Sequence, residues 1–212
     1  MTGVDSRYFE DRARDTILAK NPEPRRALFL DRDGVINVDR GYVHRADQTE
    51  WMPGIFDLCL SMAEAGFILV VVTNQAGIAR GLYSESQFVA YTQWVHEAFR
   101  DAGAPLLATY YCPHHPVAGV GSLLADCKCR KPKPGMILDA AERYGIILDH
   151  SSLIGNNESD VQAGQAAGVG RNFLLEQPGM SQGLETPGSI NVHTLLQAEQ
   201  VMTAKDRRSV EE

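Results

Sequence analysis

Two aspartates separated by one residue, Asp31 and Asp33, directly follow a short apolar run at residues 27–30. Residues two apart on an extended chain point to the same side, so both carboxylates can face one substrate. One carboxylate can attack phosphorus, while the other protonates the leaving oxygen and then activates water. A divalent cation such as Mg²⁺ would bring the anionic nucleophile and the anionic phosphate together. The pair therefore indicates magnesium-dependent phosphoryl transfer, although the motif alone is also typical of a strand-end turn with a solvated carboxylate.

A second group of chemically active residues lies between residues 112 and 129, where three of the four cysteines are crowded together. No secretory signal is visible, so a disulfide framework is not expected and a metal site is favoured. Cys112, Cys127 and Cys129 together with one imidazole match the tetrahedral ligand set of structural zinc. His114 and His115 both lie at positions that can supply this imidazole.

The rest of the chain alternates apolar runs with helical patterns. The apolar runs predict buried parallel strands at residues 27–30, 67–72, 106–111, 152–155 and 171–175. Helical periodicity and capping residues predict helices at residues 55–65, 84–101, 137–144 and 159–167. This alternation predicts an α/β fold, a Rossmann-like parallel sheet with helices on both faces. Ligands bind at the carboxyl ends of such strands, where Asp31, Thr73 and Asn156 are expected.

Length and charge limit the possible classes of protein. The chain has 212 residues with a formal net charge of −7, and 44% of them are hydrophobic, values typical of one globular domain. No Lys/Arg-rich stripe is present, so no nucleic-acid partner is expected. No targeting segment and no apolar run of membrane-spanning length occurs. We therefore expect a cytoplasmic protein without a membrane partner, and a monomer, because no exposed apolar stripe stands out.

The expected organisation is a single domain over residues 26–204, preceded by a peripheral segment at residues 1–25. In that segment Phe9, Ala13 and Ile17 recur at helical spacing and predict a short amphipathic helix. A Gly/Pro-rich loop is expected at residues 177–187. Residues 205–212 form a charged tail that is expected to fray.

Four motifs carry a resemblance to a known superfamily. Residues 29–39, which contain the aspartate pair, resemble the first motif of the haloacid-dehalogenase (HAD) superfamily of phosphatases. Residues 73–75 look like its second motif, residues 129–132 contain the lysine of its third, and residues 155–160 occupy the place of its acidic fourth. The resemblance covers roughly residues 26–176.

Within this superfamily the chain is most similar to the group of heptose bisphosphate phosphatases and histidinol-phosphate phosphatases. The narrower likeness rests on residues 41–44, 73–81 and 110–116, together with the later cysteines. It implies a zinc loop at residues 112–131, with His114 as the imidazole ligand, and only a small flap as a cap. It also implies removal of the 7-phosphate of D-glycero-D-manno-heptose 1,7-bisphosphate, a step towards nucleotide-activated heptose for lipopolysaccharide or capsule. Histidinol-phosphate phosphatase is the alternative activity.

The resemblance also implies roles for single residues. Asp31 would be the nucleophile and Asp33 the acid/base. Asp31, the main-chain carbonyl of Asp33 and the side chain of Asn156 would hold Mg²⁺. Thr73 would donate a hydrogen bond to the phosphoryl group, and Lys131 would neutralise it. The other substrate-binding positions implied are Asp39, Arg40, Gly41, Tyr42, Asn74, Gln75, Ala76, Arg130 and Asn157.

The fourth motif departs from the family pattern. Asn156 stands where the family has a magnesium-binding aspartate, Asn157 where lysine is frequent, and Ala76 where serine is common. Asparagine offers a carbonyl oxygen but no charge, so Mg²⁺ would bind more weakly unless Glu158 or Asp160 compensates. Asn156 can be a natural residue of this protein or a substitution introduced to slow turnover, and the sequence fits both. A weakly active chain that binds sugar phosphates is therefore a further interpretation.

Overall fold

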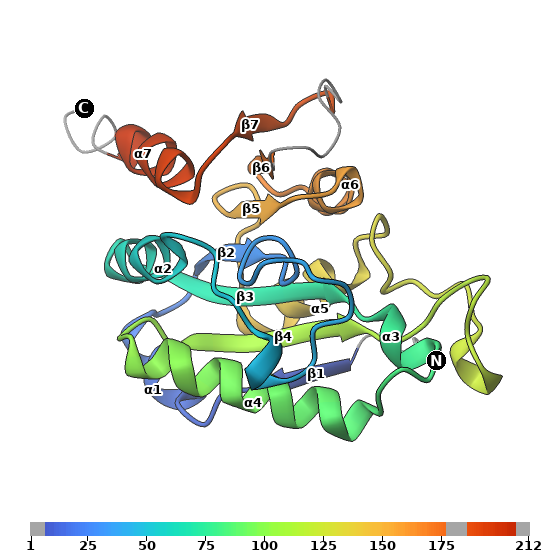
Figure 1. The fold of residues 1–212 in the computed structure, drawn as a ribbon. Coiled ribbons are helices and arrows are strands. Elements are labelled where there is room, and N and C mark those ends of the chain that lie inside the picture. The colour runs from blue at the N-terminus through green and yellow to red at the C-terminus, as the bar shows by residue number, and fades with distance from the viewer. Residues whose placement is uncertain (1–6, 177–185, 207–212) are drawn as a thin grey trace.

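Seven strands form one sheet in the computed structural model, which describes residues 7–176 and 186–206 (Figure 1). Their order across the sheet is β1-β4-β3-β2-β5-β6-β7. Neighbouring strands pair in parallel, except for β1, which runs antiparallel to β4. The strands are β1 (Arg7–Glu10), β2 (Arg26–Leu30), β3 (Phe67–Asn74), β4 (Leu106–Cys112), β5 (Ser152–Gly155), β6 (Arg171–Leu175) and β7 (Ile190–Val192). All strands predicted from apolar runs are confirmed, and with them the α/β fold.

Helices cover both faces of the sheet, as predicted (Figure 1). Helices α2, α4 and α7 contribute to the core on one face, and α1, α5 and α6 to the core on the other. The helices are α1 (Arg14–Lys20), α2 (Ile55–Glu64), α3 (Ala76–Ala79), α4 (Glu85–Asp101), α5 (Gly135–Tyr144), α6 (Glu158–Ala167) and α7 (Leu195–Asp206). Two short 3-10 turns, η1 (Ala46–Gln48) and η2 (Gly121–Leu123), lie in loops. The predicted helices are confirmed to within two residues at their ends.

Strand β2 shows how these layers place the aspartate pair. Leu28 and Leu30 pack into the core beneath α2 and α7, while Ala27 and Phe29 pack into the core beneath α5. A strand buried on both faces is apolar at every position, which explains the uninterrupted run in the sequence. The strand ends at Leu30, so Asp31 is the first residue beyond it. Because β3 and β5 flank β2 in parallel, all three carboxyl ends lie at the same edge.

The N-terminal segment differs from the helix predicted there. Phe9 lies in β1, where it pairs with Thr109 and its ring packs edge-on against His96 at 4.9 Å between centroids. The helical prediction is therefore wrong for Phe9, because pairing with the sheet edge overrides a weak local period. It is confirmed for Ile17, which is buried in α1.

The C-terminal region adds β7 and α7, which the sequence patterns did not predict. The backbone of α7 continues to Asp206, so the helix includes the first two residues of the predicted charged tail. Residues 207–212 and most of the predicted loop at 177–187 lie outside the described residues. Within the described ranges, no helix combines the length and the apolar character needed to cross a membrane.

Candidate active site

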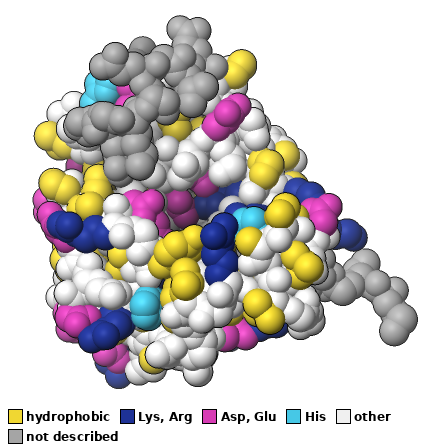
Figure 2. Space-filling model, turned by 45° about the vertical axis from the view of Figure 1, so that its right-hand side comes forward, with side chains coloured by type: hydrophobic (Ala, Val, Ile, Leu, Met, Phe, Trp, Pro, Cys, Tyr) yellow, Lys and Arg dark blue, Asp and Glu magenta, His cyan; other side chains and the backbone are white. Residues whose placement is uncertain are grey.

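A cavity of about 360 Å³ opens at the carboxyl ends of β2, β3 and β5. Figure 2 shows this side of the molecule, with acidic side chains inside a hollow and Lys or Arg side chains at its rim. Tyr83 and Ser159 contribute to the lining without having been predicted as site residues, and Asp160, which the sequence offered only as a charge to compensate for Asn156, lines it too. The lining residues that were predicted are Asp31, Asp33, Asp39, Gly41, Tyr42, Thr73, Asn74, Gln75, Ala76, Lys131 and Asn157.

The ammonium group of Lys131 organises the floor of this cavity. Its Nζ lies 2.8 Å from Asp31 Oδ1 and 2.6 Å from Asp160 Oδ1, and it donates a hydrogen bond to the Val72 carbonyl at 2.8 Å. Burial lowers the pKa of Lys131, but the two carboxylates more than offset this and raise it, so the group stays charged. A signal for Asp160 was present in the sequence. It lies three residues after Asn157, whose backbone N–H it caps at 3.0 Å at the start of α6.

Asp31 sits among more negative than positive charge. Burial raises its pKa to about 7, Lys131 opposes this shift, and Asp160 and Asp33 add to it. A hard divalent cation fits such a place, because it prefers oxygen donors and would balance the excess of carboxylates. Asp31 and Asp33 therefore fit a magnesium site by the chemistry of their donor atoms.

Thr73 and Gln75 extend the floor from the end of β3. The Gln75 amide donates hydrogen bonds to Thr73 Oγ1 at 2.9 Å and to Asp33 Oδ2 at 3.4 Å. The Tyr83 hydroxyl donates to Gln75 Oε1 at 2.6 Å and so fixes which way the amide points. Because Thr73 Oγ1 accepts from Gln75, its own proton is free to be donated to a phosphate oxygen. Tyr83 lies between α3 and α4, in no motif, so sequence reasoning had no signal for it.

One wall of the cavity comes from the flap, which we define as residues 39–50. Asp39 Oδ1 accepts a hydrogen bond from the Gly41 N–H at 2.8 Å. Gly41 and Tyr42 both have positive φ angles, of 76° and 55°, a conformation that is easy for glycine but strained for tyrosine. This turn presents Tyr42 to the cavity, with the Arg80 guanidinium 6.0 Å from the centroid of its ring.

Three predicted site residues lie beside the cavity and not in its described lining. Arg40 forms an ion pair within the flap. Arg130 donates a hydrogen bond from Nη1 to the carbonyl of His114 at 3.1 Å. Asn156 follows β5 directly and accepts a hydrogen bond at Oδ1 from Asn157 Nδ2 at 2.9 Å. Its amide oxygen is thus at the carboxyl edge of the sheet, but it is turned towards its neighbour.

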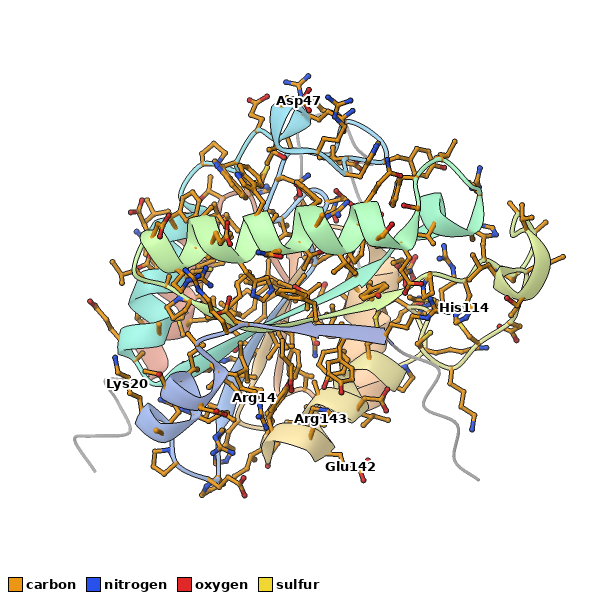
Figure 3. All side chains as sticks on the ribbon, turned by 90° about the horizontal axis from the view of Figure 1, so that it is seen from below. Arg14, Lys20, Asp47, His114, Glu142 and Arg143 are labelled. Atoms are coloured by element: carbon orange, nitrogen blue, oxygen red, sulfur yellow. The ribbon has the colours of Figure 1, made fainter. Side chains whose placement is uncertain are left out.

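A second cluster lies in the zinc loop, residues 112–131. The ligand atoms of Cys112, His114, Cys127 and Cys129 all lie within 4.8 Å of one another. In Figure 3, His114 is labelled in this loop, beyond the end of α4 that lies away from α1. Asp47, labelled in the same view, belongs to the flap. The geometry brings His114, and not His115, to the three sulfurs.

The distances in this cluster suit one tetrahedral ion. Cys127 Sγ lies 3.4 Å from Cys112 Sγ and 3.3 Å from Cys129 Sγ, and His114 Nδ1 lies 3.5 Å from Cys129 Sγ. Zinc binds thiolates at about 2.3 Å, so sulfurs this close can share one ion after a small outward movement. A hydrogen bond from Cys129 lowers the pKa of Cys112 to about 5, which supplies a thiolate ready to bind metal.

The chain has close sequence relatives. It is 46% identical over 149 residues to the D-glycero-beta-D-manno-heptose-1,7-bisphosphate 7-phosphatase of Vibrio cholerae, across 70% of this chain and 80% of that protein. It is 47% identical over 150 residues to the D-glycero-alpha-D-manno-heptose-1,7-bisphosphate 7-phosphatase of Burkholderia mallei, across 71% of this chain and 79% of that protein. The chain belongs to the heptose bisphosphate phosphatase family of the HAD superfamily. Residues 128–175 also match the family described as HAD-hydrolase-like.

Solved structures agree with membership of the heptose bisphosphate phosphatase family. The fold matches the crystal structure of a HAD-like phosphatase from Mesorhizobium loti with a TM-score of 0.79 and 32% identity, covering 95% of this chain and 96% of that one. It matches the D,D-heptose 1,7-bisphosphate phosphatase from B. bronchiseptica with a TM-score of 0.73 and 30% identity, covering 85% of this chain and 99% of that one. The latter structure is a complex with magnesium and phosphate.

Proposed function

We propose that this chain is a magnesium-dependent phosphatase that removes the 7-phosphate of D-glycero-D-manno-heptose 1,7-bisphosphate. The observation that carries the proposal is the buried ammonium of Lys131 held between Asp31 and Asp160 at the floor of the cavity. Catalysis of phosphoryl transfer consists mainly of positioning and of charge stabilisation, and this group supplies both. The names of the relatives from Vibrio cholerae and Burkholderia mallei support the choice of substrate.

The cavity residues act in two chemical steps. An oxygen of the Asp31 carboxylate attacks phosphorus, and the bond from phosphorus to the sugar oxygen breaks while Asp33 gives that oxygen a proton. Asp33 then accepts a proton from water, whose oxygen attacks the phosphorus of the aspartyl-phosphate. The bond from phosphorus to the Asp31 oxygen breaks, which releases inorganic phosphate and restores the Asp31 carboxylate. Thr73 donates a hydrogen bond to the phosphoryl oxygens, and Lys131 neutralises their charge in both steps.

Two metals belong to the proposal. The Asp31 carboxylate, the Asp33 main-chain carbonyl and the Asn156 amide oxygen would hold Mg²⁺, which when bound neutralises phosphate charge. Zinc on the four-residue cluster would be structural, because the protein fills all four positions. It would fix a loop that leads directly into Arg130 and Lys131, so the zinc loop sets the position of two substrate-binding cations.

The rest of the proposal concerns the substrate, the pathway and the state in which the protein acts. The substrate is a small sugar phosphate, and the reaction would serve the synthesis of nucleotide-activated heptose for lipopolysaccharide or capsule. We expect the protein to act as a monomer in the cytoplasm. The flap residues Asp39 to Tyr42, with Asn74 to Ala76, Arg130 and Asn157, would contact the sugar phosphate.

A substrate panel tests the function. Phosphate release is measured with added Mg²⁺ on both anomers of the heptose bisphosphate and on histidinol phosphate. We expect one phosphate to be released per heptose bisphosphate, and Asp31→Asn to abolish this release. Faster turnover of histidinol phosphate would overturn the substrate assignment. Turnover that persists in Asp31→Asn would overturn the mechanism.

A further inference from the structure

Arg32 lies between the two catalytic aspartates in sequence but points away from the cavity. Its side chain is only 3% exposed, whereas that of Asp33 is 22% exposed and lines the cavity. The Arg32 guanidinium donates from Nη2 to Asp33 Oδ2 at 2.7 Å and to Oδ1 at 2.9 Å, and from Nε to Oδ1 at 3.2 Å. Burial lowers the pKa of Arg32, but the carboxylate beside it raises it, and the net direction is upward. Arg32 is therefore a permanent cation that binds the Asp33 carboxylate from the side opposite the cavity.

The same guanidinium also reaches the flap. Its Nη2 donates a hydrogen bond to the Val43 carbonyl at 2.6 Å. Val43 follows Tyr42, the strained residue whose side chain lines the cavity. One buried nitrogen thus contacts both the carboxylate that handles protons and the segment that faces the substrate.

Aromatic side chains hold Arg32 in this orientation. The guanidinium carbon lies 5.2 Å from the centroid of the Tyr91 ring and 5.6 Å from that of Phe88, both on α4. These contacts are in the range of cation–π interactions and restrict rotation of the planar group. A lysine could replace the charge but not the fork of donors, because its ammonium is a point charge on a flexible stem.

Other contacts to Asp33 are weaker in kind. Asn37 Nδ2 donates to Asp33 Oδ1 at 3.1 Å, and Gln75 Nε2 donates to Oδ2 at 3.4 Å. Both donors are neutral amides, whereas hydrogen bonds from a guanidinium are charge-assisted and stronger. Among the described contacts, Arg32 is thus the strongest constraint on where the acid/base carboxylate lies.

We infer that Arg32 is a positioning residue that fixes the Asp33 carboxylate and the flap in a single arrangement. The inference rests on the proposed function, in which Asp33 protonates the leaving oxygen. It gives Arg32 no contact with substrate. Its effect on the reaction runs through Asp33, and its effect on substrate binding runs through the backbone of Val43.

Leaving groups that differ in their need for a proton test this role. An alkyl oxygen, as in the heptose phosphate, must be protonated as it leaves, whereas the nitrophenolate of p-nitrophenyl phosphate leaves without a proton. We expect Arg32→Met to lower kcat/KM for the heptose bisphosphate by about 10²-fold, and to lower it for the aryl phosphate by less than about tenfold. KM should rise for the heptose bisphosphate alone, because only the sugar contacts the flap.

Arg26 offers a matched control at the other end of β2. Its guanidinium carbon lies 4.4 Å from the centroid of the Phe67 ring, and Nη2 donates to the Ala65 carbonyl at 2.6 Å. Arg26→Met removes similar structural contacts far from the cavity, so it should lower the melting temperature without changing the ratio of alkyl to aryl activity. Arg32→Lys keeps a charge and should show the same selective loss in smaller degree. It also carries the test if Arg32→Met does not fold.

The outcomes separate the inference from the function on which it rests. A wild-type chain that releases phosphate, together with equal losses on both substrates in the Arg32 variants, overturns the inference alone. Unchanged alkyl activity in those variants also overturns it. A wild-type chain that hydrolyses neither substrate overturns the proposed function and the inference with it. A selective alkyl loss, absent from Arg26→Met, supports both.

Discussion

The cavity floor gathers carboxylates and the zinc loop gathers thiols, and different forces hold the two clusters in place. Asp31 follows β2 and Asp160 lies in the first turn of α6, and Lys131 provides the counter-charge between them. In the zinc loop, Cys112 ends β4, whereas the other three ligands lie in a segment whose described regular structure is the turn η2. Val117 and Val120 in that segment are 83% and 70% exposed, so little apolar burial stabilises the part of the loop between Cys112 and Cys127. The fold therefore sets the floor, whereas we expect the loop between Cys112 and Cys127 to depend on the proposed zinc ion.

The two regions meet at Lys131, the last residue of the zinc loop and the centre of the floor. We expect Lys131→Met to lower kcat/KM by roughly 10²–10³-fold, because a preorganised cation for the phosphoryl charge is lost. It should also lower the free energy of unfolding by about 3–5 kcal/mol, because Asp31 and Asp160 are left buried and unpaired. Phosphate release and urea unfolding measure the two effects, and bound zinc should stay at the wild-type level.

The control for that variant is two residues away. Lys133 is 43% exposed and pairs with Asp126 at 2.5 Å on the surface, where ion pairs contribute little. Lys133→Met should leave turnover within about twofold of the wild type. If Lys133→Met and Lys131→Met lose activity equally, the loss of turnover does not come from the Lys131 contacts at the floor but from a change in the loop as a whole.

Removing a zinc ligand should affect stability and zinc content more than turnover, the opposite of Lys131→Met. Cys127→Ser should abolish zinc binding and lower the free energy of unfolding by at least about 3 kcal/mol, or the melting temperature by roughly 6–12 °C. Turnover should fall less than in Lys131→Met, because the floor contacts remain. Metal analysis and calorimetry give both values.

Cys59→Ala serves as the matched change of a thiol, since Cys59 is buried in the core beneath α2. It should cost some stability but leave zinc content unchanged. A zinc-free Cys127→Ser chain that melts at the wild-type temperature would show that the loop does not depend on the metal.

The sequence predicts those parts of the molecule whose physical causes are local. Strands such as β2 are buried on both faces, so their apolar runs are continuous and easy to recognise. The aspartate pair and Lys131 lie in motifs that can be recognised without any three-dimensional information. Phe9 shows the limit, because only the neighbouring β4 decides that this residue forms an edge strand.

Contacts made at a distance could not be predicted in the same way. Tyr83 fixes Gln75 from a loop that carries no motif. Alternation along an extended chain already places Arg32 opposite the aspartates on either side of it. It does not show that the guanidinium folds back onto Asp33 and also reaches Val43. Such links arise from packing between elements far apart in the chain.

Asn156, which we propose as a magnesium ligand, is the position at which the affinity for Mg²⁺ can be raised. Asn156→Asp adds a carboxylate at the end of β5, and we expect it to tighten Mg²⁺ binding by roughly tenfold. Titration calorimetry with Mg²⁺ alone measures this without any turnover. Asn157→Asp places the same charge one residue further, at the exposed start of α6. Equal tightening in both variants would mean that general charge, and not a ligand at position 156, controls the affinity.

The smallest expected effect concerns a third polar cluster, which ties β1 to α4. Asp11 Oδ2 lies 3.0 Å from His96 Nδ1 and accepts a hydrogen bond from Arg100 at 2.6 Å. Burial lowers the pKa of His96 although Asp11 opposes it. Burial also acts to raise the pKa of Asp11, but its hydrogen bond with His96 and other contacts hold that pKa below its usual value.

Both shifts make this cluster most stable near neutral pH. The unfolded chain protonates His96 first, near pH 6.5, so the stability from neutral His96 is lost as the pH falls from there through the folded pKa. The contribution of Asp11 follows at more acidic pH, below about 4. Between pH 7 and pH 5 we expect a loss on the order of 1 kcal/mol from this cluster, measured by urea unfolding as the difference between the wild type and His96→Asn. The raised pKa of Asp31 acts in the opposite direction, but equally in both chains. His193→Asn, at a site 72% exposed, should leave this pH dependence unchanged. If the two variants behave alike, the fall in stability comes from the net charge of the chain and not from the cluster that ties β1 to α4.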